Sequence, residues 1–241
     1  MRICPVLDLL DGVVVRGIAG HRAEYRPLRS QLTDSTHPLD VARALRMEFG
    51  FCDLYVADLD GIQRQAPNSK LIQQLADEGF RVTLDAGSNS PATVTAAVET
   101  GATTVILGLE SLADPSTAAH LCENHPPEAL LFSLDLQNGT PRASAAWPDD
   151  PAAIVELVLS FGMTRILLLD LNDVGTATGG STQSLAAQIR GNLRLTELWT
   201  GGGLRGPKDL DAWQRLGADV VLVASALHDR RLTRADMVKI T

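Results

Sequence analysis

The chain has 241 residues, of which 45% are hydrophobic and 4% aromatic, and its formal net charge is -8. This length can bury one large α/β core or two smaller ones. The acidic balance leaves no basic stripe for nucleic acid, and no run of about 18 apolar residues marks a membrane span. The N-terminus is too short and too acidic for a signal peptide, and the three cysteines are widely spaced. We therefore expect a cytoplasmic protein with buried, unpaired cysteines.

Short apolar runs alternate with amphipathic stretches through the first half of the chain. The turn Asp11-Gly12 predicts that residues 13–18 fold back on the first strand, and the polar stretch 19–37 predicts a loop. The predicted strands are residues 2–8, 52–61, 80–87 and 102–111. The predicted helices are residues 38–50, 67–78, 91–100 and 115–123.

The second half continues the alternation. Its predicted strands are residues 129–139, 164–175, 197–200 and 218–227, and its predicted helices are residues 151–161, 182–190, 207–216 and 233–240. Continuous apolar strands are typical of parallel sheets that are covered on both faces. Eight strand–helix units predict a (β/α)8 TIM barrel that forms one domain over residues 1–241, with an open doubly wound sheet as the alternative.

The sequence also repeats itself. LDAGSNSP at 84–91 aligns with TGGGLRGP at 200–207, and VILGLESL at 105–112 aligns with VLVASALH at 221–228, both at an offset of 116 residues. The shared offset predicts that the barrel is built from two similar half-barrels.

Three consecutive glycines, Gly201, Gly202 and Gly203, follow a predicted strand and precede a helix that begins at Pro207. Backbone N–H groups can approach a phosphate closely where no Cβ intervenes, and a helix N-terminus favours negative charge. The pattern predicts an anion site between strand and helix. The alternative is a tight turn that only needs positive φ.

Aspartates stand at the carboxyl ends of the predicted strands, where (β/α)8 barrels place their active sites. They are Asp8, Asp58, Asp60, Asp85, Asp135, Asp170 and Asp173. Asp8 and Asp135 occupy equivalent places in the two halves, so we expect them to face each other and to act as an acid–base pair. The alternative role of the others is to cap loops or pair with Arg and Lys. No metal site is expected, because nothing fixes a ligand geometry.

Several motifs resemble the HisA/HisF barrels of histidine biosynthesis, and the resemblance covers nearly the whole chain. CPVLDLLDGVVVRG, VADLDGI and SLDLQNG resemble that family's first, second and fifth strands. DVGTATGG resembles its sixth-strand loop, and TGGGLRGPKDL with VLVASALHD resembles its C-terminal phosphate site. The chain is most similar to the isomerases, which convert an aminoaldose ribotide to an aminoketose by an Amadori rearrangement.

The resemblance implies an aldose–ketose isomerase in which Asp8 is the general base and Asp135 the general acid. The substrate- and phosphate-binding positions are expected at Gly201, Gly202, Gly203, Ala224, Ser225, Gly87, Ser88, Gly108, Gly175 and Thr176. No cofactor and no metal are implied. The expected partner is a small phosphorylated substrate, and the chain is expected to be a monomer or a homodimer.

Other residues keep two interpretations. Three arginines of the first loop can either bind an anion or remain solvated: Arg16, Arg22 and Arg26. Trp147 stands where the family has a tryptophan that stacks on the substrate, and core packing is the alternative. His21 and His228 are expected to be structural or solvated.

The departures from the family pattern concern the first phosphate site. Asp85-Ala86-Gly87-Ser88 stands where the family usually has a second Gly-Gly-Gly loop, and Glu110 adds a negative charge nearby. A carboxylate repels a phosphate dianion. Leu169 and Val174 also replace a threonine and an aspartate that are usual in the isomerases. Two alternatives to the isomerase therefore stay open: a paralogue that acts on a monophosphate in cofactor metabolism, and a non-catalytic protein that binds phosphorylated metabolites.

Overall fold

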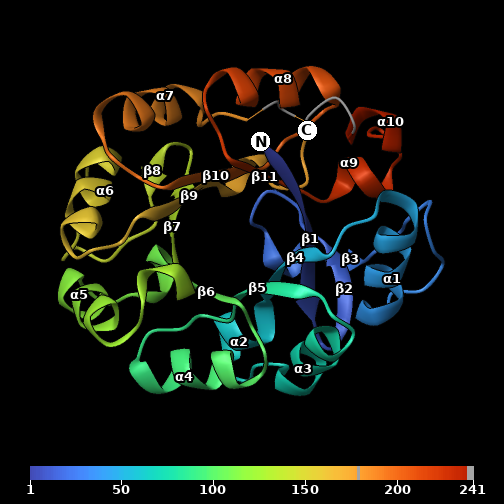
Figure 1. The fold of residues 1–241 in the computed structure, drawn as a ribbon, viewed down its shortest axis with the longest axis horizontal. Coiled ribbons are helices and arrows are strands. Elements are labelled where there is room, and N and C mark those ends of the chain that lie inside the picture. Colours follow the sequence, from blue (N-terminus) through green and yellow to red (C-terminus); the bar gives the residue numbers. More distant parts are fainter. Residues whose placement is uncertain (178–179, 238–241) are drawn as a thin grey trace.

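The computed structural model describes residues 1–177 and 180–237 (Figure 1). In this part of the chain eight parallel strands close into a barrel. They are β1 (Arg2–Leu10), β4 (Asp53–Asp58), β5 (Arg81–Asp85), β6 (Thr104–Gly108), β7 (Leu130–Gln137), β9 (Arg165–Asp170), β10 (Glu197–Gly201) and β11 (Val220–Val223). β11 pairs with β1 from Arg2↔Val220 to Pro5↔Val223, so the sheet closes on itself. The predicted (β/α)8 barrel is confirmed, and the open-sheet alternative is wrong because it would leave these two strands unpaired.

An outer ring of helices covers the barrel (Figure 1). Its members are α1 (Pro38–Phe49), α3 (Ser69–Asp77), α4 (Pro91–Glu99), α5 (Pro115–Asn124), α6 (Pro151–Ser160), α7 (Gln183–Asn192), α8 (Pro207–Arg215) and α10 (Arg234–Met237). Several begin with proline at the first position, where the missing N–H group has no intrahelical partner to lose. The predicted last helix over 233–240 is described only up to Met237, and its remaining residues lie outside the described part.

Large apolar side chains close the barrel from within. This inner cluster consists of Cys4, Tyr55, Ile106, Leu131, Leu167, Trp199, Val220 and Leu222, and it is separate from the larger cluster that includes the helices. A barrel filled in this way is a packed core and not a pore, so ligands bind at its end. Cys4 is buried there as expected, Cys122 is half-buried, and Cys52 is exposed, so the prediction of a buried Cys52 is wrong.

The two halves have matching geometry. β2 (Val13–Arg16) folds back on β1 through Asp11-Gly12 with φ of 50° and 77°, and β8 (Thr140–Pro141) folds back on β7 through Asn138-Gly139 with φ of 52° and 75°. β5 and α4 have the same lengths as β10 and α8 and precede them by 116 residues. The structure thus agrees with the predicted half-barrels.

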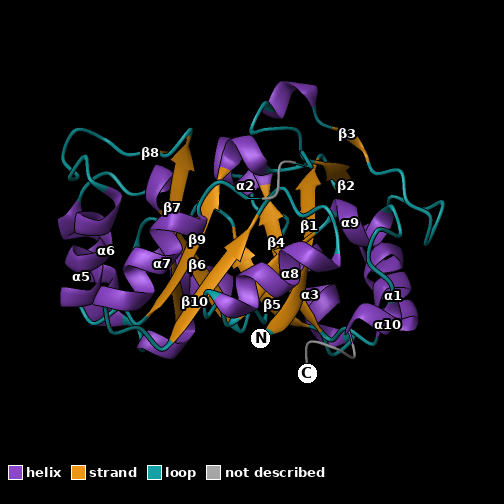
Figure 2. Ribbon diagram, turned by 90° about the horizontal axis from the view of Figure 1, so that it is seen from above, coloured by secondary structure: helices purple, strands orange, loops and turns teal. Residues whose placement is uncertain are grey.

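Six predicted strands end earlier than expected, and after four of them a short helical segment takes the place of the predicted strand end. α2 (Leu59–Arg64), α9 (Ser225–His228) and two 3₁₀ turns, Leu109–Ser111 and Leu171–Asp173, directly follow their strands. Asp58 caps α2 by accepting a hydrogen bond from the N–H of Gly61. The predicted loop over 19–37 also holds the turn Arg22–Glu24 and the short strand β3 (Arg26–Pro27). In Figure 2 the barrel strands run toward the end that carries β2, β3, β8 and α2.

Candidate active site

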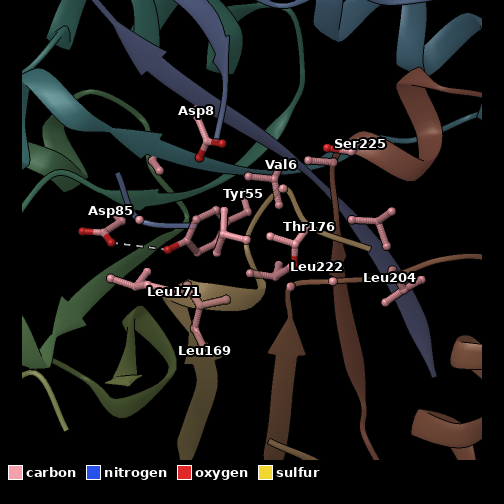
Figure 3. Close-up of a pocket in the computed structure, with 18 of the residues that line it drawn as sticks. Val6, Asp8, Tyr55, Asp85, Leu169, Leu171, Thr176, Leu204, Leu222 and Ser225 are labelled. Atoms are coloured by element: carbon pink, nitrogen blue, oxygen red, sulfur yellow. Dashed lines mark hydrogen bonds between the residues drawn. The ribbon is translucent and has the colours of Figure 1, made fainter. Parts of the chain in front are cut away.

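A cavity opens at the carboxyl ends of the barrel strands (Figure 3). Its carboxyl groups belong to Asp8, Asp85, Glu110 and Asp135. Apolar side chains form much of the remaining wall, among them those of Val6, Tyr55, Leu169, Leu171, Val174, Leu204 and Leu222. The cavity therefore combines apolar walls with a few polar groups, as small-molecule sites commonly do.

Asp8 projects from β1 into this cavity. Burial raises the pKa of its carboxyl group to about 7, against the opposing effects of the Arg22 charge and a hydrogen bond from the Gly17 backbone. Burial has this effect because the charged form loses more solvation than the neutral form. A carboxylate with a pKa near neutrality is a much stronger base than an ordinary aspartate.

Asp135 projects from β7, the strand equivalent to β1 in the other half. Asp135 is 6% exposed, and the Ser133 hydroxyl donates to its Oδ1 over 2.7 Å. Burial raises its pKa to about 7, and the charges of Asp85 and Glu110 raise it further. The cavity therefore contains two carboxyl groups that change protonation state near neutral pH, one from each half-barrel.

Asp85 is a third titratable group of the cavity. Its Oδ2 accepts a hydrogen bond from the Tyr55 hydroxyl over 3.3 Å, which Figure 3 shows as a dashed line, and its Oδ1 accepts one from the N–H of Gly87 over 3.3 Å. Burial raises the pKa of Asp85 to about 6. Asp85 thus faces the cavity as an acceptor of hydrogen bonds at neutral pH.

Glu110 lies beside these carboxyl groups and binds two arginines. Arg22, from the loop after β2, forms an ion pair with Glu110, and Arg142 forms another over 3.0 Å. Arg142 also donates to the Gln137 side chain over 2.9 Å. We call Arg22, Glu110 and Arg142 the ion-pair cluster. Two of its members, Arg22 and Glu110, line the cavity, and Arg142 joins them from the segment after β8.

The glycine turn after β10 lines the opposite part of the cavity. Gly202 and Gly203 have φ of +89° and +67°, and a Cβ on Gly202 would lie 2.9 Å from the Cβ of Asp173. Ala224 and Ser225, at the start of α9, lie beside this turn in the cavity wall. Gly201 packs against Leu222, where an added Cβ would lie 2.8 Å from the Leu222 Cβ.

The helix that begins at this cavity is α9, because Ser225 and Ala226 line the cavity. No residue of α8 lines it. The Asp209 carboxylate, from the first turn of α8, accepts from the N–H of Arg205 over 2.8 Å. The glycine pattern predicts the helix terminus at α8, because residues 218–227, which contain the start of α9, are typical of a strand. Arg231, which no sequence pattern indicates, also lines the cavity and donates to the carbonyl oxygen of Leu204 over 2.6 Å.

The loops after β2 and β9 touch each other at the mouth. The N–H of Ala19 donates to the carbonyl oxygen of Val174 over 2.7 Å, and a Cβ on Gly175 would lie 1.8 Å from the carbonyl oxygen of Gly17. Gly175 has a φ of +71°, and Thr176 lines the cavity while its hydroxyl donates to the Asp173 carbonyl over 2.8 Å. The contact holds the loop that carries Arg22 over the site.

Gly175→Ala is expected to displace this loop and to lower activity at least about tenfold, or about 1.4 kcal/mol of transition-state stabilisation. The matched control is Gly139→Ala, because Gly139 has a φ of +75° but nothing within 4 Å of an added Cβ. The control should show only backbone strain of about 1–2 kcal/mol in its unfolding free energy. Equal activities of the two variants would show that activity does not depend on this contact between the loops.

Other predicted positions lie away from the main cavity or serve the scaffold. Arg16 forms two hydrogen bonds to Asp229 at 2.9 and 2.6 Å and lines a smaller adjoining pocket. Trp147 is 5% exposed, packs on Phe132 and donates to the Leu112 carbonyl. In this structure it therefore serves core packing, the alternative interpretation of this tryptophan. His228 is buried against Ser30, and burial lowers its pKa to about 4.

The remaining strand-end aspartates hold loops. Asp60 accepts from the N–H of Asp11, Asp170 accepts from the N–H groups of Asn138 and Gly139, and Asp173 accepts from the N–H of Ser181. Gly87 lines a pocket together with Arg22 and Glu110, whereas Ser88 lines only a different pocket that contains neither. An added Cβ on Gly108 would lie 3.3 Å from Asp135 Oδ2. Within residues 1–177 and 180–237 no group of three or more His, Cys, Asp or Glu side chains is arranged to hold a metal ion. No helix of this part is long and apolar enough to cross a membrane.

Fold and site together define a (β/α)8 barrel built from two similar halves. Each half contributes a carboxyl group to the cavity at the carboxyl ends of the strands. The chain belongs to the histidine biosynthesis protein family, whose model matches residues 2–233. The resemblance expected from its motifs is therefore confirmed.

Relatives of similar length are found in several organisms. An uncharacterised protein of Methanocaldococcus jannaschii is 29% identical over 228 residues, which cover 95% of this chain and 93% of that protein. The 1-(5-phosphoribosyl)-5-((5-phosphoribosylamino)methylideneamino)imidazole-4-carboxamide isomerase of Thermus thermophilus is 27% identical over 237 residues, 96% of each chain. The isomerase of the same name from Serratia proteamaculans is 29% identical over 243 residues, 96% of this chain and 95% of that protein.

Proposed function

We propose that this protein is an aldose–ketose isomerase that performs an Amadori rearrangement on a phosphorylated sugar amine or ribotide amine. The observation that carries the proposal is the pair of buried carboxyl groups, Asp8 and Asp135, in one cavity, each with its pKa raised to about 7. Near neutral pH such a pair can hold one proton, so that one group serves as base and the other as acid. The isomerase names of the relatives support the same reaction class.

The two carboxyl groups divide the chemistry. Asp135 protonates the ring oxygen while the bond between C1 and that oxygen breaks, and the amine nitrogen's lone pair forms the C1=N bond. Asp8 then removes the C2 proton, and the electron pair of the C2–H bond forms the enol-amine. Protonated Asp8 then delivers its proton to C1, and Asp135 takes up the enol O–H proton. These transfers give the aminoketose and restore both carboxyl groups. The reaction needs no redox partner, because atoms and electrons balance within the substrate.

Phosphate is proposed to bind between the glycine turn and the start of α9. Within the described part of the chain, the N–H groups of Gly203 and Ser225 have no protein partner, and the Arg231 guanidinium lies in the same wall. Oriented backbone N–H groups and an arginine are strong partners for an anion. A phosphate held there would anchor the substrate along the apolar wall toward Asp8 and Asp135.

The proposal is tested with purified protein and with cells that lack the histidine-pathway isomerase. We expect the purified protein to turn over phosphorylated sugar amines, and the measured reaction is the conversion of the aminoaldose to the aminoketose. Growth rescue without added histidine would identify the histidine-pathway ribotide as a substrate. A well-folded protein that turns over neither the ribotide nor monophosphorylated sugar amines would contradict the isomerase and favour the non-catalytic alternative.

The second candidate function, an isomerase outside histidine biosynthesis, is favoured by one feature of the site. Asp85 and Glu110 stand beside the place where the first half-barrel would bind a second phosphate. In that case the protein would turn over a monophosphorylated sugar amine but would not rescue the histidine-requiring cells.

A further inference from the structure

We propose that the site takes a substrate with a single phosphate group, and that Glu110 and Asp85 are the specificity-determining residues that exclude a second one. This inference rests on the proposed function for the position of the substrate in the cavity. Its basis is a comparison within the molecule, because each half-barrel supplies one loop pair where a phosphate could bind: the loops after β5 and β6 in the first half, and those after β10 and β11 in the second. The loop pair of the second half is open to an anion, whereas that of the first half is filled by the protein's own side chains.

Three of the differences between equivalent positions in the two loop pairs bear on anion binding. At the 116-residue offset, Asp85 matches Gly201, Ala86 matches Gly202, and Glu110 matches Ala226. β5 and α4 have the same lengths as β10 and α8, and β6 and the turn at Leu109 begin 116 residues before β11 and α9, so these matches reflect the structure as well as the alignment. The differences therefore lie in side chains and local backbone, on a shared framework.

The backbone of the first loop pair does not form the same turn. Gly203 and its counterpart Gly87 both have positive φ, +67° and +71°. Gly202 also has a positive φ, +89°, but Ala86 at the matching place does not adopt one. Alanine enters this region only at a cost, because its Cβ approaches the carbonyl oxygen. The first half therefore lacks one of the two consecutive left-handed residues that shape the turn after β10.

The N–H group that should meet a phosphate is also engaged. The N–H of Gly87 donates to Asp85 Oδ1 over 3.3 Å, while the matching N–H of Gly203 has no partner within residues 1–177 and 180–237. A phosphate at Gly87 would have to displace a carboxylate from this donor. It would then lie beside that carboxylate, and two negative charges about 4 Å apart repel each other strongly at the low dielectric of a partly buried site.

The ion-pair cluster uses the positive charge of this region. Arg22 and Arg142 both bind the Glu110 carboxylate, whose side chain is only 17% exposed. Arg22 and Glu110 line both the main cavity and a smaller pocket that Gly87 also lines, and Arg142 reaches them through its ion pair with Glu110. Because Glu110 occupies the donors that would otherwise bind an anion, the side chain acts as a built-in substitute for the second phosphate. In the second half Ala226 has no such group, and Arg231 lines the cavity, while its ion-pair partner Asp229, 3.5 Å away, is not among the residues that line it.

The experiment counts phosphate ions with the full chain and inorganic phosphate as the probe. Crystals soaked in tens of millimolar phosphate are expected to show one ion in the wild type, at Gly203 and Ser225. The double variant Asp85→Gly/Glu110→Gln is expected to show a second ion at Gly87 with Arg22. Each removed carboxylate should improve phosphate affinity at that second site about fivefold in calorimetric titration, or about 1 kcal/mol.

The matched control is Glu24→Gln, because Glu24 lies on the same loop as Arg22 but pairs only with the exposed His21 among the ion pairs of the described chain. It should bind one ion, like the wild type. Two ions in the wild type, none at Gly203, or no gain of a second ion in the double variant would each overturn the inference. The ion at Gly203 reports on the folding of each variant. Because no turnover is measured, a failure of the isomerase assay leaves this result independent.

Discussion

Asp8→Asn is expected to lower kcat by about 10³-fold, while phosphate binding stays close to wild type and the melting temperature at neutral pH equals or exceeds that of the wild type. The amide has the shape of the carboxyl group but cannot accept the C2 proton. Asp8 is raised to a pKa of about 7 mainly by burial, so its removal takes away a base that is poised for neutral pH. Steady-state kinetics on the substrate identified by the isomerase assay measure the effect, and phosphate titration confirms that the site is intact.

The control for this variant is Asp11→Asn. Asp11 is on the same hairpin but points to solvent, with a 67% exposed side chain that pairs with Arg64. It should keep nearly full activity. The base must be ionised, so wild-type kcat should rise as the pH increases through about 7, and any residual activity of Asp8→Asn should lack this rise. A variant that retains near-normal activity would show that Asp8 is not the base.

The architecture could be predicted because the barrel strands follow a simple pattern. Residues such as Leu7 in β1 and Leu134 in β7 are fully buried, so their strands read as continuous apolar runs. Proline at the start of helices and glycine at positions such as Gly50 marked the helix ends. The short helices α2 and α9 were missed because they directly continue apolar strands, and four to six residues are too few to show a helical period.

The candidate site was only partly predictable. The repeat located Asp8 and Asp135, because equivalent positions in two halves meet at one barrel end. Tyr55 was missed since LYVAD reads as a buried strand, and only the fold shows that its hydroxyl donates to Asp85. Arg142 and Arg231 were missed for a related reason: each enters the site through contacts with segments far along the chain. Such pairings depend on loop paths, which local sequence patterns do not specify.

The raised pKa values also determine how the site affects the stability of the folded protein at each pH. The folded state of Asp135 has a pKa of about 7, and the unfolded value is near 3.8, so the folded chain binds more protons between these pH values. Stability contributed by this group is therefore present at acidic pH and is lost as the pH rises toward 7. Asp8 and Asp85 act in the same direction. Three buried carboxyl groups in one mouth are thus unfavourable for stability at neutral pH, which fits groups retained for function.

Asp135→Asn separates these two effects. The amide cannot protonate the ring oxygen, so kcat should fall by about 10²–10⁴-fold, while its Oδ1 can still accept from the Ser133 hydroxyl. Because a buried charge is removed, the melting temperature above pH 7 should equal or exceed that of the wild type. Thermal melts at pH 5 and at about pH 8 measure the second effect, with the larger gain expected at the higher pH.

The pH profile then assigns the roles of the two carboxyl groups. A general acid must be protonated, so wild-type kcat should fall as the pH increases above about 7, and this alkaline limb should be absent from the residual activity of Asp135→Asn. The rise at lower pH, which belongs to Asp8, should remain in that variant. If Asp135→Asn instead loses the acidic limb and keeps the alkaline one, the roles of base and acid are reversed, with Asp135 accepting the C2 proton and Asp8 protonating the ring oxygen.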